Sequence, residues 1–309
     1  MRWWRTTSRP RARDEAGGRR TEATKATAVV IRLMKSSDLG WASDITQKEG
    51  WGFVRSDFQR ILSHTPGGSF VAVQRGRRIG MLTTMCHGRT CWIGNVVVAS
   101  GHRGAGIGNT LVEAALVFAA GKMMRRTALL SREGTAGFYS GMGFRRDARF
   151  VGLGGLPREA GEHPNVVLVT PRLLSELLVL DREACDEERR HLLQLLARDF
   201  GRHFLVFVES GRALGFIVGK PGKGLVDVGP WVCACGRPDV ARALFLALSA
   251  GTKKRLEVYV PQKRTWVLDL LESLGLERTA TFLEMRKGGL KRRTSEKVEM
   301  LAVAGLEKG

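Results

Sequence analysis

The stretch that decides the fold is Val96-Val97-Val98-Ala99-Ser100-Gly101-His102-Arg103-Gly104-Ala105-Gly106-Ile107-Gly108-Asn109. A strand-like run of valines leads into a loop with four glycines and one arginine, and an apolar-periodic segment follows at once. Glycine has no Cβ, so the backbone N–H groups of such a loop can approach a ligand closely. The first turn of the following helix adds unpaired N–H donors and the positive end of its dipole. Residues 103–109 are therefore predicted to bind a phosphate-like anion.

Other phosphate-binding loops do not fit the spacing. A dinucleotide fingerprint needs a third glycine where this chain has Asn109. A Walker loop needs Gly-Lys followed by Ser or Thr, and both Gly-Lys pairs, at 219–220 and 222–223, lack that hydroxyl. An ordinary strand-to-helix turn is the alternative, but glycines at the alternate positions 104, 106 and 108 exceed what a turn requires.

The 309 residues predict two domains, and a hydrophobic content of 43% allows real cores. Much of the net charge of +20 lies at the ends: residues 1–28 carry eight bases and three acids (+5), and residues 286–309 carry seven bases and three acids (+4). We expect two disordered basic arms, and a nucleic-acid partner stays open. No run approaches the roughly 18–20 apolar residues that cross a bilayer, so a soluble, cytoplasmic protein is expected. The five cysteines lack zinc-ligand spacing and are expected to be free thiols.

The pattern of apolar residues predicts alternating strands and helices. Strands are expected at 29–33, 69–74, 79–85, 90–99, 127–131 and 144–150, with helical stretches at 34–62, 111–121 and 135–142. The Gly- and Pro-rich residues 152–165 are the expected linker.

The second half repeats the first. Residues 71–82 align with residues 206–217 at an offset of 135, with five of twelve positions identical. Residues 138–144 match residues 270–276 at an offset of 132. Matching segments in the same order predict a duplication, the alternative being two unrelated domains that share common hairpin patterns.

Two motifs together resemble the GCN5-related N-acetyltransferases, the GNAT superfamily. Val96–Val98 with Arg103-Gly104-Ala105-Gly106-Ile107-Gly108 is similar to the family's R/Q-x-x-G-x-G/A signature at the end of its fourth strand. Residues 137–144, which read Gly-Phe-Tyr-Ser-Gly-Met-Gly-Phe, resemble its second motif. The resemblance covers residues 29–150 and implies an α+β fold: two tandem GNAT-like domains, each a mostly antiparallel sheet flanked by helices.

The resemblance implies acetyl-CoA or another acyl-CoA as co-substrate and an amine as acceptor, with no metal. Backbone amides of Arg103, Gly104, Ala105, Gly106, Ile107, Gly108 and Asn109 would hold the CoA diphosphate, and Val96, Val97 and Val98 would hold the pantetheine arm and polarise the thioester. Tyr139 falls where the family places the proton donor to the departing thiolate, although an aromatic packing role is the alternative.

The general base is left open. The family often has a glutamate on the fourth strand, but residues 92–95 read Trp-Ile-Gly-Asn. Glu49, Asp57 and Glu133 are candidates, each with surface charge as the alternative. Trp41 and Trp51 are candidates for the acceptor pocket or the core, and His64, His87 and His102 are expected to be neutral surface residues.

The second half lacks the chemical parts of the first. At the place of the anion loop it has one glycine, Gly236, followed by a proline and Asp239, and Leu271 stands opposite Tyr139. The expected organisation is a basic arm (1–28), a GNAT domain (29–151), a linker (152–165), a degenerate GNAT-like domain (166–287) and a basic tail (288–309).

These features predict an acyl-CoA-dependent N-acyltransferase that moves an acyl group directly to a small-molecule or protein amine. The alternative is a non-catalytic acyl-CoA sensor or nucleic-acid-binding regulator on the same scaffold. The acceptor, the acyl length and the oligomeric state are left open.

Overall fold

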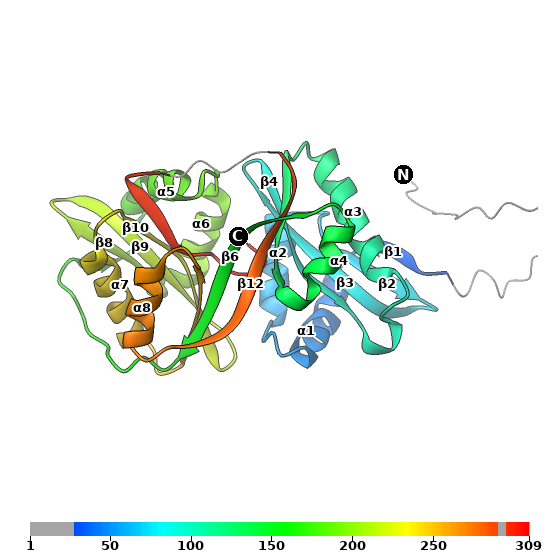
Figure 1. Cartoon of the computed structure of the whole chain (residues 1–309), viewed down its shortest axis with the longest axis horizontal. Helices are drawn as coiled ribbons and strands as arrows, with labels where there is room; N and C mark the ends of the chain where they lie inside the picture. The colour runs from blue at the N-terminus through cyan, green and yellow to red at the C-terminus, as the bar shows by residue number, and fades with distance from the viewer. Residues whose placement is uncertain (1–27, 290–294, 309) are drawn as a thin grey trace, which may run out of the picture.

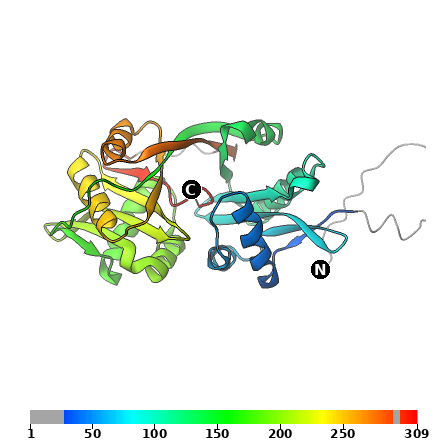
Figure 2. The ribbon, with the colours of Figure 1, turned by 90° about the horizontal axis from the view of Figure 1, so that it is seen from below.

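The computed structural model describes residues 28–289 and 295–308, in which two α+β halves share one long mixed sheet. The strand order is β1-β2-β3-β4-β5-β12-β6-β11-β10-β9-β8-β7, and β13 pairs with β10 outside this path. Figures 1 and 2 show the two halves side by side, with β6 and β12 running between them. The expected basic arm lies almost wholly outside the described residues.

The N-terminal half follows the predicted order of elements. Its strands are β1 (Val30–Leu33), β2 (Phe70–Gln74), β3 (Arg77–His87), β4 (Thr90–Val98), β5 (Arg126–Arg132) and β6 (Arg145–Gly155). Its helices are α1 (Leu39–Lys48), α2 (Arg55–His64), α3 (Ile107–Gly121) and α4 (Ala136–Gly141). The long helical stretch expected at 34–62 is two helices, and Gly50 and Gly52 between them both adopt positive φ.

The C-terminal half has the same layout. Its strands are β7 (Val166–Leu168), β8 (Phe204–Glu209), β9 (Arg212–Pro221), β10 (Leu225–Ala234), β11 (Arg255–Pro261), β12 (Glu277–Gly288) and β13 (Val298–Ala302). Its helices are α5 (Pro171–Cys185), α6 (Arg190–Phe200), α7 (Pro238–Ala250) and α8 (Thr265–Ser273).

The repeat predicted from the sequence is visible in the two hairpins that it aligned. The β2–β3 turn places Arg75 and Gly76 at φ of 48° and 73°, and the β8–β9 turn places Ser210 and Gly211 at 51° and 76°. Two successive positive φ values are the signature of the type I′ turn, whose twist suits a two-residue hairpin. The two halves therefore share this turn as well as the element order.

The two halves exchange their last strands. β12 of the C-terminal half lies between β5 and β6, and β6 of the N-terminal half lies between β12 and β11. This corrects the expected boundaries: residues 152–155 are the end of β6, paired with β11, and do not belong to a linker. Each half therefore contributes a strand to the sheet of the other, and neither half forms its complete sheet from its own residues.

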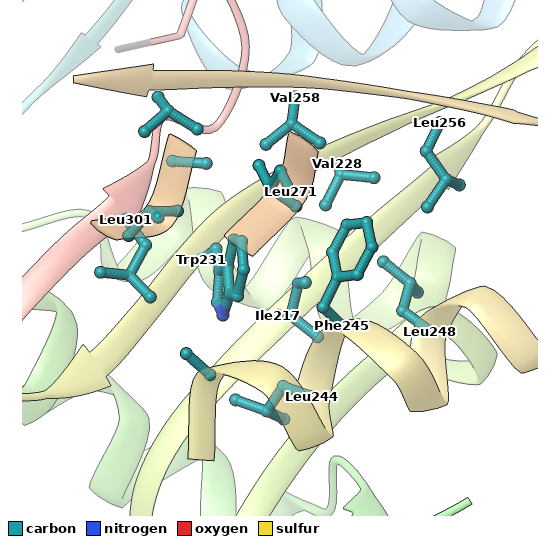
Figure 3. Packing of buried hydrophobic residues seen from close by; sticks show 14 of the residues in the cluster. Ile217, Val228, Trp231, Leu244, Phe245, Leu248, Leu256, Val258, Leu271 and Leu301 are labelled. Carbon is teal, nitrogen blue, oxygen red and sulfur yellow. The ribbon is translucent and has the colours of Figure 1, made fainter. Parts of the chain in front are cut away.

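The expected basic tail at 288–309 is also corrected. Residues 298–302 form β13, which pairs antiparallel with β10. Figure 3 shows Leu301 in the same buried cluster as Trp231 of β10 and Phe245 of α7, whose rings stack with centroids 5.7 Å apart. The sequence pattern did not predict this strand, because the strand is short and follows a charged segment.

A buried ion pair also joins the two halves. Glu187, in the α5–α6 connection, accepts hydrogen bonds from the Arg126 guanidinium and the Thr90 hydroxyl on the sheet of the other half. All three side chains are buried. Desolvated charges require such pairing, so this contact fixes how the halves dock.

The expectation of free thiols is correct for three cysteines. Cys185, Cys233 and Cys235 are free, whereas Cys86 and Cys91 form a disulfide across the β3–β4 hairpin. No helix in the described part of the chain is long and apolar enough to cross a membrane.

Candidate active site

The candidate site lies where β4 diverges from β5. The two parallel strands pair only through Thr90, Cys91 and Trp92, so residues 93–98 have no β5 partner in the described structure. On the other edge, the register of β4 with β3 shifts between Met81 and Thr83, and Asn95 adopts a φ of 52°. This bulge and the divergence of the strands open a gap in the sheet beside Val96.

The loop after β4 leaves its amides free. Within the described residues, no hydrogen bond is recorded for the backbone N–H groups of residues 104–109. The loop is closed instead by bonds outside that range, from His102 N to Ala99 O (2.8 Å) and from Thr110 N to Gly106 O (3.2 Å). Six adjacent donors thus lie at the start of the 15-residue helix α3, where the sequence predicts an anion site.

Two glycines of this loop are required by its backbone. Gly104 and Gly106 adopt φ of 80° and 77°, which side chains on L-residues rarely allow. A Cβ built on either would meet nothing within 4 Å, so the space over the amides is open to a ligand. Gly108 instead allows α3 to approach α4, because a Cβ there would lie 3.2 Å from the ring of Phe138.

Arg103 braces the loop. Its Nε donates to Val98 O at 2.9 Å, and its guanidinium pairs with Glu49, which follows α1. The side chain is thus tied to the end of β4 and to the neighbouring helix.

The loop and the gap line one cavity of about 940 Å³ between the two halves. Of the predicted site residues, it is lined by Val96, Val98, Arg103, Gly104, Gly106, Ile107, Gly108, Asn109 and Tyr139. Val97 points to the opposite face and packs in the core with Met81, and Ala105 is exposed. The predicted residues therefore converge on one place, with only the side chains of Val97 and Ala105 outside it.

Tyr139 lies on α4 at the wall of this cavity. Its ring packs edge-on against Phe138 and Phe144, with centroids 4.8 Å and 6.0 Å away, and only 9% of the residue is exposed. Burial raises the pKa of the phenol to about 12. A phenol with this pKa remains protonated at neutral pH and can act as a proton donor.

The carboxylates proposed as base have structural partners. Glu49 pairs with Arg103, and Glu133 lies 3.2 Å from Arg149. The Asp57 carboxylate accepts a hydrogen bond from Val54 N at 2.8 Å, and this bond caps α2. The same carboxylate lies 2.7 Å from the Arg60 guanidinium. Among these three, Asp57 alone lines the cavity.

The structure places the aromatic and histidine candidates in different environments. Both tryptophans are half-buried and pack against the core, and Trp51 also lines the cavity. The expectation of surface histidines is wrong for His87, which is buried at the end of β3. His64 is half-buried, with a pKa lowered mainly by desolvation, and His102 lies at the cavity wall. Among the described residues, no cluster of three or more His, Cys, Asp or Glu could hold a metal ion.

The C-terminal half contributes residues that the sequence did not indicate. Lys220, Asp227, Glu257, Tyr259, Glu307 and Lys308 line the same cavity. Desolvation raises the pKa values of Glu257 and Tyr259, which lie two residues apart on β11. The alternation of Glu257 and Tyr259 along one strand could have indicated that both face the same side. Nothing in the local sequence, however, predicts that this strand lies against the first half.

The equivalent gap in the C-terminal half is closed. β10 pairs with β11 only from Leu225 to Val228, and past the cis bond Gly229–Pro230 it pairs with β13 instead. At the start of α7, the Asp239 carboxylate accepts hydrogen bonds from the Arg237 guanidinium, which also binds Glu209. The space that is open in the first half is thus filled in the second, and a carboxylate stands at the start of the equivalent helix.

Family models confirm what the two halves are. One for the acetyltransferase (GNAT) domain matches residues 65–146, and a second with the same description matches residues 177–298. The chain has two GNAT domains in tandem. No curated protein matches the sequence significantly.

Solved structures show the same two-domain fold. A putative acetyltransferase from Pyrococcus horikoshii is 21% identical with a TM-score of 0.76, covering 91% of this chain and 96% of that one. A GCN5-related N-acetyltransferase from Sphaerobacter thermophilus is 16% identical with a TM-score of 0.63, covering 86% and 98%. A tandem GNAT protein from the clavulanic acid biosynthesis pathway is 16% identical with a TM-score of 0.61, covering 85% and 100%. At these identities the likeness concerns the fold of both GNAT domains together.

Proposed function

We propose that this protein is an acyl-CoA-dependent N-acyltransferase whose chemistry takes place in the N-terminal GNAT domain. The observation that carries the proposal is the row of free amides at residues 104–109, which shares a cavity with the unpaired edge of β4 and with Tyr139. An anion site, an open strand edge and a protonated phenol are what the transfer from a diphosphate-bearing thioester requires.

Each part has a distinct task in this proposal. The amides of residues 104–109 hold the diphosphate of the acyl donor, which is acetyl-CoA or a related acyl-CoA. The free edge of β4 beside Val96 and Val98 holds the pantetheine arm and donates to the thioester oxygen, where negative charge develops. Tyr139 protonates the departing thiolate, and burial keeps its phenol in the acid form until then.

In this proposal the C-terminal GNAT domain binds no acyl donor and is degenerate in that sense. β13 fills its gap between β10 and β11, and Asp239 would repel a phosphate at the start of α7. Its role is to form the far wall of the cavity, where Asp227, Glu257 and Glu307 face the acceptor. Asp227 pairs with Lys220 and Glu307 pairs with Lys308, so Glu257 is the carboxylate of this wall to which we assign the attraction of the ammonium form of a small-molecule or protein amine.

The test compares wild type with Gly106→Glu in thermal stabilisation by acetyl-CoA and in thiol release with a library of amines. The added carboxylate places negative charge on the diphosphate site, so stabilisation and thiol release should both be lost. Gly76→Glu is the matched control, since Gly76 also has a positive φ (73°) and open space but lies at the β2–β3 turn. Stabilisation that survives in Gly106→Glu would contradict the proposal.

A further inference from the structure

The segment after β13 returns to the cavity between the two domains. Val303 N donates to Tyr259 O at 3.2 Å, and Lys308 N donates to Gly305 O at 3.1 Å, which closes a turn. Figures 1 and 2 both place the end of the chain between the two halves. Buried Lys220 anchors this turn by donating to Ala304 O at 2.6 Å and to Gly229 O.

This turn packs against β4 next to the bulge. A Cβ built on Gly94 would lie 2.8 Å from Cα of Glu307, so the absence of a side chain at Gly94 is what admits the turn. Gly94 directly precedes Asn95 and the open edge of β4. Residues 305–308 therefore lie at the sheet end of the cavity, beside the place proposed for the thioester.

Lys308 contributes a largely buried side chain to the cavity. The side chain is 14% exposed and lines the cavity, and its Nζ pairs with the Glu307 carboxylate. Desolvation, and next the charge of Lys220, lower the pKa of Lys308 to about 8. An amine with this pKa has about half of its molecules uncharged near pH 8, whereas an exposed lysine is almost wholly protonated there.

Lys220 is a poorer nucleophile, although it is more deeply buried, with 7% of its side chain exposed. Its Nζ donates to two carbonyl oxygens and lies 3.1 Å from Asp227, so its protons are fully engaged. Lys308 Nζ, in contrast, donates to the Glu307 carboxylate. Of the two largely buried lysines that line the cavity, Lys308 is thus the one with a lone pair available once its proton is lost, whereas Lys223, which also lines the cavity, is exposed.

We propose that Lys308 is an intramolecular acyl acceptor, which the N-terminal GNAT domain modifies from acyl-CoA. The inference rests on the function proposed above and identifies a primary amine on an aliphatic chain as the acceptor class. The uncharged Nζ attacks the thioester carbonyl carbon, so that a C–N bond forms and the C–S bond breaks. Glu307 takes one proton from the attacking nitrogen, Tyr139 gives one to the thiolate, and exchange with solvent restores both groups. The products are Nε-acyl-Lys308 and free CoA.

The experiment incubates the full chain with acetyl-CoA and no added amine, and locates acetyl groups by mass spectrometry of peptides. Lys263, exposed in the β11–α8 loop, serves as the internal control for non-enzymatic acetylation. We expect Lys308 to be labelled at least roughly tenfold faster than Lys263, because a positioned amine has a high effective concentration. The rate should not depend on protein concentration, and Lys308→Arg should lose this label whereas Lys263→Arg should keep it.

Labelling of Lys308 no faster than that of Lys263, or unaffected by Gly106→Glu, would overturn the inference. The failure of the broader proposal is distinguishable. If Lys308 stays unmodified while acetyl-CoA stabilises the protein and added amines release thiol, only the intramolecular acceptor is excluded. If acetyl-CoA neither stabilises the protein nor yields thiol with any amine, the proposed function itself fails.

Discussion

Glu307 occupies the space that a side chain on Gly94 would need. A Cβ on Gly94 would overlap the Cβ of Glu307 and lie 2.8 Å from its Cα. These residues are far apart in the sequence, and their contact closes one end of the cavity between the GNAT domains. Glu307 thus fills the space beside β4 that the missing side chain of Gly94 leaves.

Gly94→Ala should displace residues 303–308. The methyl group would strike the backbone of Glu307, and overpacking of this kind costs about 1–3 kcal/mol. Hydrogen exchange should show faster exchange in residues 303–308, together with a lower midpoint in chemical unfolding. Gly40→Ala is the control, since a Cβ there meets nothing within 4 Å and the residue lies in helix α1. Unchanged exchange in Gly94→Ala would contradict the packing described.

Tyr139→Phe should reduce turnover and leave the affinity for acyl-CoA unchanged. Loss of a general acid lowers kcat by roughly 100-fold or more, whereas the diphosphate contacts lie elsewhere. The chain has two tyrosines, so Tyr259→Phe is the natural control and should retain most of the turnover. Because burial raises the pKa of Tyr139 to about 12, wild-type activity should not decline through ionisation of this phenol below about pH 11. Equal kcat in Tyr139→Phe and wild type would remove the acid role.

Glu187→Gln should weaken the docking of the two domains. It leaves the buried Arg126 guanidinium without its carboxylate, which typically costs about 3–5 kcal/mol. Chemical unfolding measures the loss. The neighbouring Glu188→Gln is the matched control, because Glu188 is exposed and lies 3.8 Å from Arg190 in a surface pair worth about 0–1 kcal/mol. Similar losses of unfolding free energy in the two variants would show that the buried pair stabilises the protein no more than the surface pair does.

Asp38 should make stability depend on acidic pH. It is fully buried and accepts hydrogen bonds from Arg32 at 2.7 Å and from Arg78 at 2.6 Å. The hydrogen bond from Arg32 is the main cause of a pKa well below its usual range. A depressed folded-state pKa stabilises the fold above the unfolded value, about 3.9, and this stabilisation is lost as the pH falls below it. Asp38→Asn should therefore lower the unfolding free energy at pH 7, and the gap to wild type should narrow toward pH 3. A gap independent of pH would contradict this account.

Local features of the site were predictable from the sequence, and its long-range contacts were not. Gly104 and Gly106 adopt a backbone conformation that only glycine adopts easily, so the loop could be predicted from its local sequence. The exchange of β6 and β12 leaves no local trace, because a strand has the same alternating pattern whichever partner it pairs with. The contact of residues 303–308 with Gly94 joins segments that are far apart in the sequence, so no local pattern predicts it.

The most direct test of the central claim is a crystal structure with an acyl-CoA bound, in which the distances from the diphosphate oxygens to the amide nitrogens of residues 104–109 are measured. We predict several of these distances within about 2.7–3.2 Å, with the thioester beside Val96. A diphosphate bound elsewhere, for example at the start of α7, or a loop whose amides turn to protein acceptors, would contradict the account.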